Sequence, residues 1–417
     1  MRTSFSYIER SKEATMIYRS AYMNVLKQYR GVQLVKILAG IRRSGKSTIL
    51  NCLKEDLLAE GVAKDLILTH NFALMTMPSA MDAARMYEII SAQITDGDTY
   101  YLLLNEIQEV EGWEKVLNTF LERANVDIYV TGSNSKLLSS EISSYLSGRY
   151  IQIDVYPLSF SEYLLFKGTD VNQLSNKNQA LLDYMQEGGF PLIAANNFSH
   201  EQTYQIVQDI YHAVVETDIV RRFKLRDTEL FSRTVAFTLD NVGKVFSASS
   251  ISKFLKNEGR KLSTETIYNY LNWLEKSFVI YRCKRFDLQG KEVLRTQEKF
   301  YVADSSLKFS LFGFAPTAVA SMLENLCYLE LRRRAYQVYV GKLGSKEIDF
   351  VADKTGKRIY VQVCRNLPED SAREIENLTQ IPDSWPKYIL TLDEFATGTV
   401  DGVEIMHIAD FLLDQTL

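Results

Sequence analysis

The segment GIRRSGKST spans Gly40–Thr48 and directly follows an apolar, β-branched run, VQLVKILA, at Val32–Ala39. It fits the pattern G-x-x-x-x-G-K-[ST] at every position, and a run of helical character follows it over residues 47–60. The glycines of such a loop let backbone N–H groups turn inward around phosphates, and the following helix points its positive dipole end toward them. Strand, loop and helix in this order predict a binding site for ATP.

The residues of this loop have distinct expected roles. Lys46 is expected to reach the β- and γ-phosphates, and the hydroxyl of Ser47 is expected to bind Mg²⁺. ATP and Mg²⁺ are therefore the cofactors that the sequence predicts. The residues expected to contact the nucleotide are Gly40, Arg42, Arg43, Ser44, Gly45, Lys46, Ser47 and Thr48.

A second apolar run, YYLLLNE at Tyr100–Glu106, ends in an acidic residue, as the metal-binding strand of a nucleoside triphosphatase does. Glu106 is the expected catalytic base. The position before it, where an Asp would hold Mg²⁺ through water, is Asn105. Its amide oxygen can accept a hydrogen bond from a metal-bound water but carries no charge, so weaker Mg²⁺ binding is expected. Three interpretations stay open: a natural variant, an impaired enzyme or an engineered change.

Two further polar positions lie near later strand-like runs. Ser133 and Asn134 follow the run 126–130, and either could touch the γ-phosphate or orient the attacking water; a simple polar turn is the alternative. Arg149 precedes the run 151–155. It could face the nucleotide of a neighbouring subunit in a homo-oligomer, or it could be a surface arginine in an ion pair. The predicted catalytic residues are Lys46, Glu106, Asn134 and Arg149.

Apolar runs of strand length alternate with helical stretches over the first 157 residues, which predicts βαβ units and a mostly parallel sheet. After Pro157 the pattern becomes helical, and a helix–helix–turn–helix–hairpin order follows, as in a winged helix. The final part is α/β again. The predicted modules are an α/β phosphate-loop core at 1–157, a helical lid at 158–226, a winged helix at 227–315 and an α/β module at 316–417.

The segment Ser263–Ser277 (STETIYNYLNWLEKS) is the expected recognition helix of the winged helix, and basic residues lie just before it. Phosphates and groove edges of double-stranded DNA are the expected contacts, and a surface for protein contacts is the alternative. The residues predicted to contact DNA are Lys253, Lys256, Lys261, Thr264 and Asn269, and the wing candidates are Arg282, Lys284, Arg285 and Lys291. The run Arg332–Arg334 is expected to be a solvated helix face.

The composition sets few further limits. The chain has 417 residues and a formal net charge of −4, which neither demands nor excludes a nucleic-acid partner. Its four cysteines are isolated, so neither a zinc site nor a disulfide framework is indicated. No run of about 18 apolar residues occurs, so a membrane span is not expected. A cytoplasmic location is the resulting expectation.

Several sequence blocks, in order, resemble one family of bacterial and archaeal AAA-type ATPases that carry a C-terminal domain of unknown function. The blocks are GIRRSGKST at 40–48, LLLNEIQEVEGWEKVLN at 102–118, VTGSNSKLLSSEISSYLSGRY at 130–150 and YPLSFSEYL at 156–164, with weaker matches at 188–191 (GGFP), 209–223 (DIYHAVVETDIVRRF), 347–353 (EIDFVAD) and 360–364 (YVQVC). The resemblance implies ATP hydrolysis, a AAA lid followed by a winged helix, and a C-terminal domain like a degenerate restriction endonuclease. The family's usual Asp before Glu106 is Asn105 here, which puts hydrolysis in question but not binding.

An endonuclease of that type needs two acids, and a lysine two residues beyond the second, to hold Mg²⁺ and activate water. The corresponding positions here are Glu324, Asp349 and Gln362, with Cys364 in the place of the lysine. An inactive nuclease fold is favoured, and a structural polar cluster is the alternative. Three function hypotheses follow: a DNA-associated ATPase that uses ATP to control assembly or DNA binding, a nucleotide-gated protein scaffold with weak hydrolysis, and an ATP-dependent nuclease.

Overall fold

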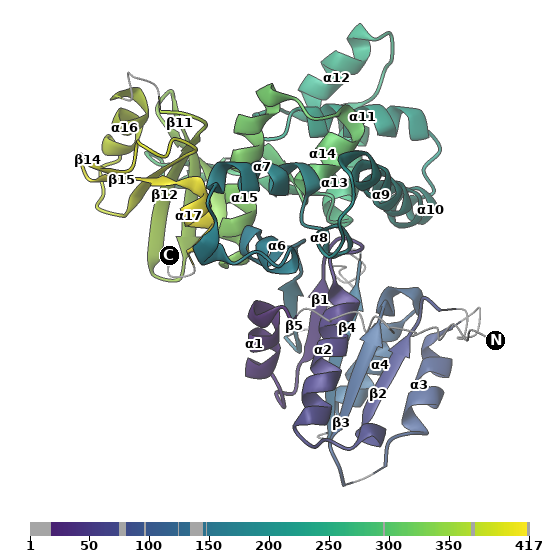
Figure 1. The fold of residues 1–417 in the computed structure, drawn as a ribbon. Coiled ribbons are helices and arrows are strands. Elements are labelled where there is room, and N and C mark those ends of the chain that lie inside the picture. Colours follow the sequence, from purple (N-terminus) through teal and green to yellow (C-terminus); the bar gives the residue numbers. More distant parts are fainter. Residues whose placement is uncertain are drawn as a thin grey trace, which may run out of the picture.

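The computed structural model describes residues 18–74, 81–95, 97–123, 125–133, 145–146, 148–294, 297–367 and 372–414. In Figure 1 the N-terminal sheet lies at the bottom, and a second sheet, built mainly from C-terminal strands, lies at the upper left. Helices from the middle of the chain lie above the N-terminal sheet and beside the second one. Among the residues described, no helix is both long and apolar enough to cross a membrane.

Five parallel strands form the N-terminal sheet, in the order β2-β3-β4-β1-β5. They are β1 (Val35–Ala39), β2 (Ile67–Asn71), β3 (Tyr100–Asn105), β4 (Val126–Gly132) and β5 (Tyr150–Asp154). The predicted parallel sheet is thereby confirmed. The first strand begins at Val35 rather than at Val32, and the side chain of Val32 is 43% exposed.

Helices cover both faces of this sheet, because successive strand residues point to opposite sides. Ile37 of β1 packs into the cluster that contains α3 and α4, whereas its neighbour Leu38 packs into the cluster that contains α1 and α2. The helices are α1 (Ser20–Gln28), α2 (Lys46–Ala59), α3 (Ala83–Ser91) and α4 (Trp113–Leu121). All of β1 is buried, so the strand that leads into the predicted phosphate loop is anchored in the core.

The segment after β5 is helical, as the sequence predicts for 158–226. Its elements are α6 (Phe160–Phe166), the 3-10 turn η4 (Val171–Gln173), α7 (Lys177–Glu187), α8 (Pro191–Ala194), α9 (His200–Ala213), the π-helix η5 (Val214–Val220) and α10 (Arg221–Phe223). Ser159 and Ser199 begin α6 and α9 with capping boxes, which satisfy free N–H groups at both helix starts. The π-helix continues α9 without a break, and such segments occur often at functional sites.

Three helices and an antiparallel strand pair follow in the order predicted for a winged helix. They are α11 (Thr228–Asp240), α12 (Ala248–Asn257), α13 (Thr264–Lys276), β6 (Ile280–Cys283) and β9 (Lys299–Val302), with α14 (Ser305–Phe312) behind them. The connection between β6 and β9 does not form a separate wing. Its strands, β7 (Arg285–Asp287) and β8 (Glu292–Val293), join the second sheet, where β7 pairs in parallel with β10 (Gln337–Leu343).

The second sheet has the order β14-β15-β13-β12-β11-β10-β7-β8 over the described residues. Its remaining strands are β11 (Lys346–Lys354), β12 (Lys357–Cys364), β13 (Lys387–Thr391), β14 (Gly398–Val400) and β15 (Val403–His407), and its helices are α15 (Val319–Arg333), α16 (Ala372–Thr379) and α17 (Ile408–Leu413). The strands β10, β11 and β12, together with α15, agree with the α/β pattern predicted for the final part of the chain. Two strands of this sheet come from before residue 316, the predicted start of the last module.

The arginines at the end of α15 correct one expectation. The side chains of Arg333 and Arg334 are only 12% and 10% exposed, so the run Arg332–Arg334 is not a solvated helix face. Both guanidinium groups pair with Glu330, and both donate to backbone carbonyl groups of other elements. Burial is tolerated here because each charge has an anion and carbonyl acceptors around it.

Candidate nucleotide-binding site

The predicted phosphate loop joins the carboxyl end of β1 to the amino end of α2. Two of its positions require glycine. A Cβ at Gly40 would lie 2.1 Å from the carbonyl oxygen of Val155, and Gly45 has a φ of +96°, in the left-handed region. The start of α2 therefore presents free N–H groups and the positive end of its dipole at the loop, which suits an anion.

Lys46, the expected phosphate-binding lysine, is folded back onto the loop. Its Nζ donates to the carbonyl oxygens of Gly40 and Ile41, each at 2.9 Å, and the side chain is buried. Burial lowers the pKa of Lys46 to about 8, although the charge of Glu106 acts in the opposite direction. The hydroxyl of Ser44 is buried with no hydrogen-bond partner in the described part of the chain. A buried ammonium and an unsatisfied hydroxyl in one loop fit a phosphate group.

Ser47 and Asn105, the predicted metal residues, meet beside the loop. The hydroxyl of Ser47 donates to Asn105 Oδ1 at 2.8 Å, and the hydroxyl of Thr131, on β4, donates to the same oxygen at 2.6 Å. Hydroxyl and amide oxygens are the hard donors that Mg²⁺ takes, so these residues fit a Mg²⁺ site, with one negative charge fewer than a carboxylate would bring.

Glu106 lies directly after β3 in a left-handed conformation, with a φ of +53°. Its backbone N–H donates to the hydroxyl of Thr131 at 3.0 Å, and its carboxylate accepts from the hydroxyl of Ser133 at 3.1 Å and from the amide of Gln108. A non-glycine residue held in this region stores strain that the surrounding contacts must offset, and such strain concentrates at functional sites. The carboxylate of the predicted base is thus held in one orientation.

Of the other two predicted catalytic residues, Asn134 and Arg149, the structure describes only Arg149. Asn134 lies outside the described residues. Arg149 precedes the amino end of β5, whereas the phosphate loop follows the carboxyl end of β1. Because these two strands are parallel, Arg149 and the loop lie at opposite ends of the strands. Its guanidinium donates to Asn118 at 3.1 Å and pairs with Glu122. Arg149 cannot serve the loop of its own chain, and its role toward a neighbouring subunit stays a prediction.

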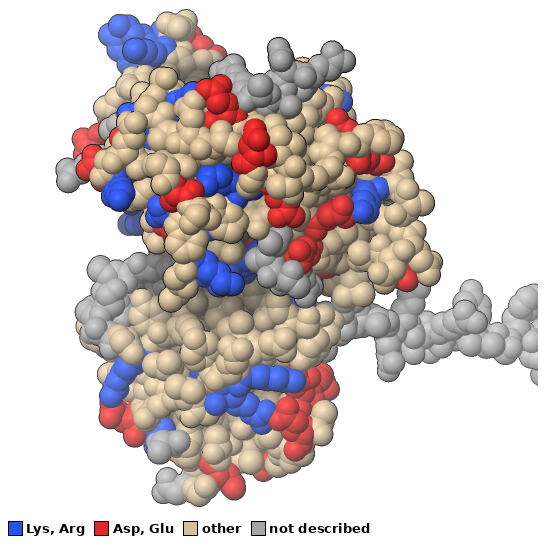
Figure 2. All heavy atoms as spheres, turned by 90° about the vertical axis from the view of Figure 1, so that its left-hand side faces the viewer, with Lys and Arg blue, Asp and Glu red and all other residues tan. Residues whose placement is uncertain are grey.

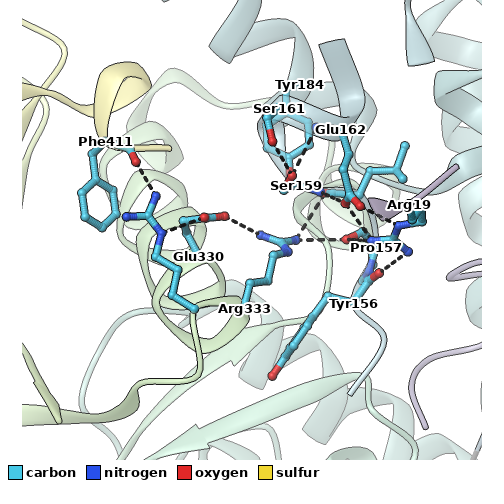
Figure 3. Close-up of polar contacts among 12 residues, drawn as sticks. Arg19, Tyr156, Pro157, Ser159, Ser161, Glu162, Tyr184, Glu330, Arg333 and Phe411 are labelled. Atoms are coloured by element: carbon cyan, nitrogen blue, oxygen red, sulfur yellow. Dashed lines mark hydrogen bonds and ion pairs between the residues drawn. The ribbon is translucent and has the colours of Figure 1, made fainter. Parts of the chain in front are cut away.

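Two charged residues near the loop were missed at the sequence level. Asp218, on the π-helix, pairs with Arg42 of the loop through two hydrogen bonds of 2.7 and 3.0 Å. Asp218 lies within the block 209–223 that resembles the AAA-type family, which was the available signal. Arg19, just before α1, lies behind the loop and donates to the carbonyl oxygen of Ser44. Figure 3 shows its guanidinium beside Glu162 and the backbone at Tyr156. A single arginine near the start of a chain gives no sequence signal.

The three residues of the predicted relic nuclease site come together. Glu324 on α15 and Asp349 on β11 lie 2.8 and 3.5 Å from Nζ of Lys299, and Oε1 of Gln362 accepts from the backbone N–H of Asp349 at 3.2 Å. Lys299, which sequence reasoning missed, also pairs with Glu347 at 2.9 Å. The ammonium therefore supplies positive charge in the middle of these carboxylates.

Burial raises the pKa of two carboxyl groups in this cluster, Glu324 and Asp349. Burial and the neighbouring Asp349 raise the pKa of Glu324 to about 7, although Lys299 and the hydroxyl of Tyr301 act against the shift. Over the parts of the chain that the structure describes, no group of three or more His, Cys, Asp or Glu side chains is arranged to hold a metal. The cluster is an internally paired charge network.

The five residues predicted to contact DNA are all exposed, on α12, on α13 and in the turn between these helices. Figure 2 shows Lys and Arg side chains gathered at the top of the molecule, the end at which α12 lies in Figure 1. Arg282, a predicted wing contact, is in contrast mostly buried. Its side chain is only 18% exposed, and it pairs with Glu275 and Glu298.

Parts of the sequence and of the fold match known proteins. A family model described as an AAA domain matches residues 33–164, and a domain of unknown function (DUF8612) matches residues 178–318. An uncharacterised protein of Methanocaldococcus jannaschii is 29% identical over 383 residues, which cover 88% of this chain and 82% of that protein. The solved Walker-type ATPase of Pyrococcus abyssi covers 72% of this chain and 97% of its own at 15% identity, with a TM-score of 0.49, too low to carry a functional argument.

An uncharacterised protein of Haemophilus influenzae gives a stronger match. It is 37% identical over 399 residues, which cover 95% of this chain and 99% of that protein. The AAA match extends from β1 into α6 and agrees with the parallel sheet and the phosphate loop. The chain belongs to the family of this Haemophilus influenzae protein, and its N-terminal part is an AAA domain.

Proposed function

We propose that this chain is an ATP-binding AAA-type ATPase that uses ATP binding and hydrolysis to control its assembly or its binding to double-stranded DNA. One observation carries the proposal: the phosphate loop, the Ser47–Asn105 pair and Glu106 converge at the carboxyl ends of β1, β3 and β4. The AAA domain match supports the nucleotide, and the exposed lysines of α12 and the following turn support the nucleic acid.

Different residues of the chain have different roles in ATP hydrolysis. Lys46 and the N–H groups at the start of α2 bind the phosphates, and the free hydroxyl of Ser44 adds one donor. Glu106, fixed by Ser133 and Gln108, accepts a proton from the attacking water as general base. Mg²⁺, held by Ser47 and through water by Asn105, would neutralise phosphate charge when bound.

A second candidate is a nucleotide-gated scaffold that hydrolyses ATP slowly. It is favoured by Asn105, whose amide oxygen occupies the metal-side position without a negative charge. A nuclease is the least favoured candidate. Lys299 already pairs with the carboxylates of the relevant cluster, and Gln362 and Cys364 stand where an acid and a lysine would be needed.

ATP turnover, measured with and without double-stranded DNA, tests the proposal. Wild-type protein should hydrolyse ATP, and DNA should change the rate. Lys46→Ala should lose ATP binding, whereas Glu106→Gln should bind ATP and not turn it over. ATP binding that is unchanged in Lys46→Ala would show that the loop assignment is wrong. ATP binding with no turnover and no response to DNA would favour the scaffold.

DNA binding has its own test. Replacing Lys253, Lys256 and Lys261 together by Ala should weaken binding and reduce the salt dependence of log K by about one unit for each lost phosphate contact. Lys276→Ala, an exposed lysine at the far end of α13, is the matched control and should leave the slope unchanged. Equal effects of the two changes would mean that this surface is not the DNA contact.

A further inference from the structure

Arg19 is a buried charged group that directly contacts the phosphate loop. It lies just before α1 and is 4% exposed. Its Nη1 donates to the carbonyl oxygens of Ser44 and Tyr156, at 2.9 and 3.0 Å. Its Nε and Nη2 donate to the two carboxylate oxygens of Glu162, at 2.8 and 2.7 Å. Figure 3 shows this guanidinium between the chain at Tyr156–Pro157 and the start of α6.

The contact with Ser44 bears on the geometry of phosphate binding. The Ser44–Gly45 peptide is planar and trans, so its C=O and N–H groups point in opposite directions. A guanidinium that holds the C=O therefore turns the N–H of Gly45 to the other side of the peptide. The hydrogen bond is charge-assisted, which makes it stronger than a bond between neutral groups. Arg19 thereby fixes one peptide of the loop before any ligand arrives.

Arg19 is itself held in place by a rigid partner. Glu162 closes a capping box with Ser159: its carboxylate accepts from the N–H of Ser159 at 2.9 Å, while its own N–H donates to the Ser159 hydroxyl. A carboxylate that is fixed at a helix start cannot follow Arg19 if the arginine moves. Arg19 and Glu162 therefore fix the position of the Ser44 carbonyl relative to α6, a helix of the predicted lid.

A second buried arginine, Arg333, forms hydrogen bonds with the same segment between β5 and α6. The Nη2 of Arg333, on α15, donates to the carbonyl oxygens of Pro157 and Leu158, at 3.1 and 3.3 Å. The carbonyl of Pro157 is also 3.5 Å from Nη2 of Arg19, and the Arg333 guanidinium lies over the ring of Tyr156. The segment 156–162, here called the strap, therefore links the phosphate loop to a helix of the C-terminal module. Figure 3 shows Arg19 and Arg333 on either side of the strap at Pro157.

We propose that Arg19 is a positioning residue for phosphate binding, and that the strap couples the affinity of the loop for ATP to α15 through Arg333. The proposal rests on the proposed nucleotide-binding function. The strap connects the C-terminal module to the nucleotide site, because Arg19 and Arg333 both bind carbonyl groups of this one short segment.

The first test measures the dissociation constant for ATP in Arg19→Met and Arg19→Lys. Loss of a charge-assisted hydrogen bond to the loop should weaken ATP binding by about tenfold or more in Arg19→Met. Arg19→Lys keeps the charge and should recover part of the affinity. Added ethylguanidinium should restore binding to an Arg19→Ala variant, a rescue that a purely structural arginine would not show at temperatures where the variant is fully folded.

A matched pair on α15 tests the coupling. Arg333→Met should weaken ATP binding by about threefold or more, whereas Arg334→Met should not. Arg334 is equally buried and also pairs with Glu330, but it donates to the carbonyl of Phe411 instead of to a carbonyl of the strap. The double variant Arg19→Met/Arg333→Met should lose less affinity than the product of the two single effects.

The outcomes separate this proposal from the proposed function. If wild-type protein does not bind ATP, the proposed function is wrong. If wild-type protein binds ATP and folded Arg19→Met binds it equally well, Arg19 does not position the loop. If Arg333→Met and Arg334→Met have equal effects, the strap does not couple the two modules. Should Arg19→Met fail to fold, Glu162→Gln, which loosens Arg19 without removing it, should weaken ATP binding in the same direction.

Discussion

Arg42 in the phosphate loop and Asp218 in the π-helix lie 176 positions apart in the chain and form an ion pair with two hydrogen bonds. Asp218 is 1% exposed, whereas Arg42 is 25% exposed. A buried carboxylate beside a site for a polyanion would repel the ligand unless a cation neutralised it. Arg42 therefore both holds the loop against α9–α10 and removes this repulsion.

Removing Arg42 should destabilise the protein because it leaves Asp218 buried without its hydrogen-bonded ion-pair partner. Arg42→Met should lower the free energy of unfolding by about 2–4 kcal/mol, and adding Asp218→Asn should recover part of the loss. Urea denaturation checks both. The control is Arg43→Met, the adjacent and exposed arginine, for which a change within about 0.5 kcal/mol is expected. Equal losses at the two positions would contradict this account.

Restoring a carboxylate at Asn105 should raise ATP turnover. Asn105 Oδ1 accepts hydrogen bonds from the hydroxyls of Ser47 and Thr131, and an aspartate oxygen can accept the same two bonds. The added charge should hold Mg²⁺ more tightly, and a gain in rate of about tenfold would correspond to about 1.4 kcal/mol of transition-state stabilisation. Steady-state kinetics at several Mg²⁺ concentrations measure it. An unchanged rate would mean that another group already supplies the charge.

ATP affinity should fall as the pH rises above 8. Burial lowers the pKa of Lys46 to about 8 in the free protein, and bound phosphates favour the charged ammonium, so binding must be accompanied by proton uptake at higher pH. Between pH 8 and the higher pKa of the bound state, affinity should drop by up to about tenfold per pH unit. Titration calorimetry in buffers of different ionisation enthalpy measures the uptake.

An arginine at position 46 provides the control for this pH dependence. Guanidinium keeps its proton throughout the range, so whatever ATP binding Lys46→Arg retains should vary little between pH 7 and pH 9.5. A profile as steep as that of the wild type would assign the proton to another group.

Lys299 should be essential for the stability of the C-terminal module. Its side chain is 4% exposed and its ammonium pairs with Glu324, Glu347 and Asp349, so Lys299→Met should cost about 3–5 kcal/mol of unfolding free energy at pH 8. The cost should shrink toward pH 5. Glu324, whose pKa is raised to about 7 by burial and Asp349, is then protonated, and less repulsion is left behind.

A surface lysine on the neighbouring part of the sheet is the control for Lys299. Lys346 forms an ion pair with Glu376 in which the side chains are 30% and 58% exposed. Lys346→Met should therefore change the unfolding free energy by at most about 1 kcal/mol, with little dependence on pH. A cost at Lys299 that did not vary with pH would argue that packing, rather than charge, sets its contribution.

The local elements could be predicted from the sequence because they depend on residues close together in the chain. The loop GIRRSGKST requires glycine at fixed positions, and the alternation of Ile37 and Leu38 between two packing clusters follows from the twofold repeat of a strand. Spacing and periodicity also placed Glu106 and Asn105 at a strand end. The hairpin after β6 was the exception, since its strands pair with a sheet formed more than 50 residues later.

The sequence by itself therefore determined a phosphate-binding loop at the end of a parallel strand, with an acid and an amide on a neighbouring strand. Only the tertiary structure decided which buried charges stand together: Arg19 with Glu162, Arg42 with Asp218, and Lys299 with Glu324. The physical reason is that a charged side chain is usually exposed unless a partner satisfies it. That partner can come from anywhere in the chain. The residue type alone therefore predicts that a charged side chain lies on the surface, and only the fold shows which charged side chains are buried beside a partner of opposite charge.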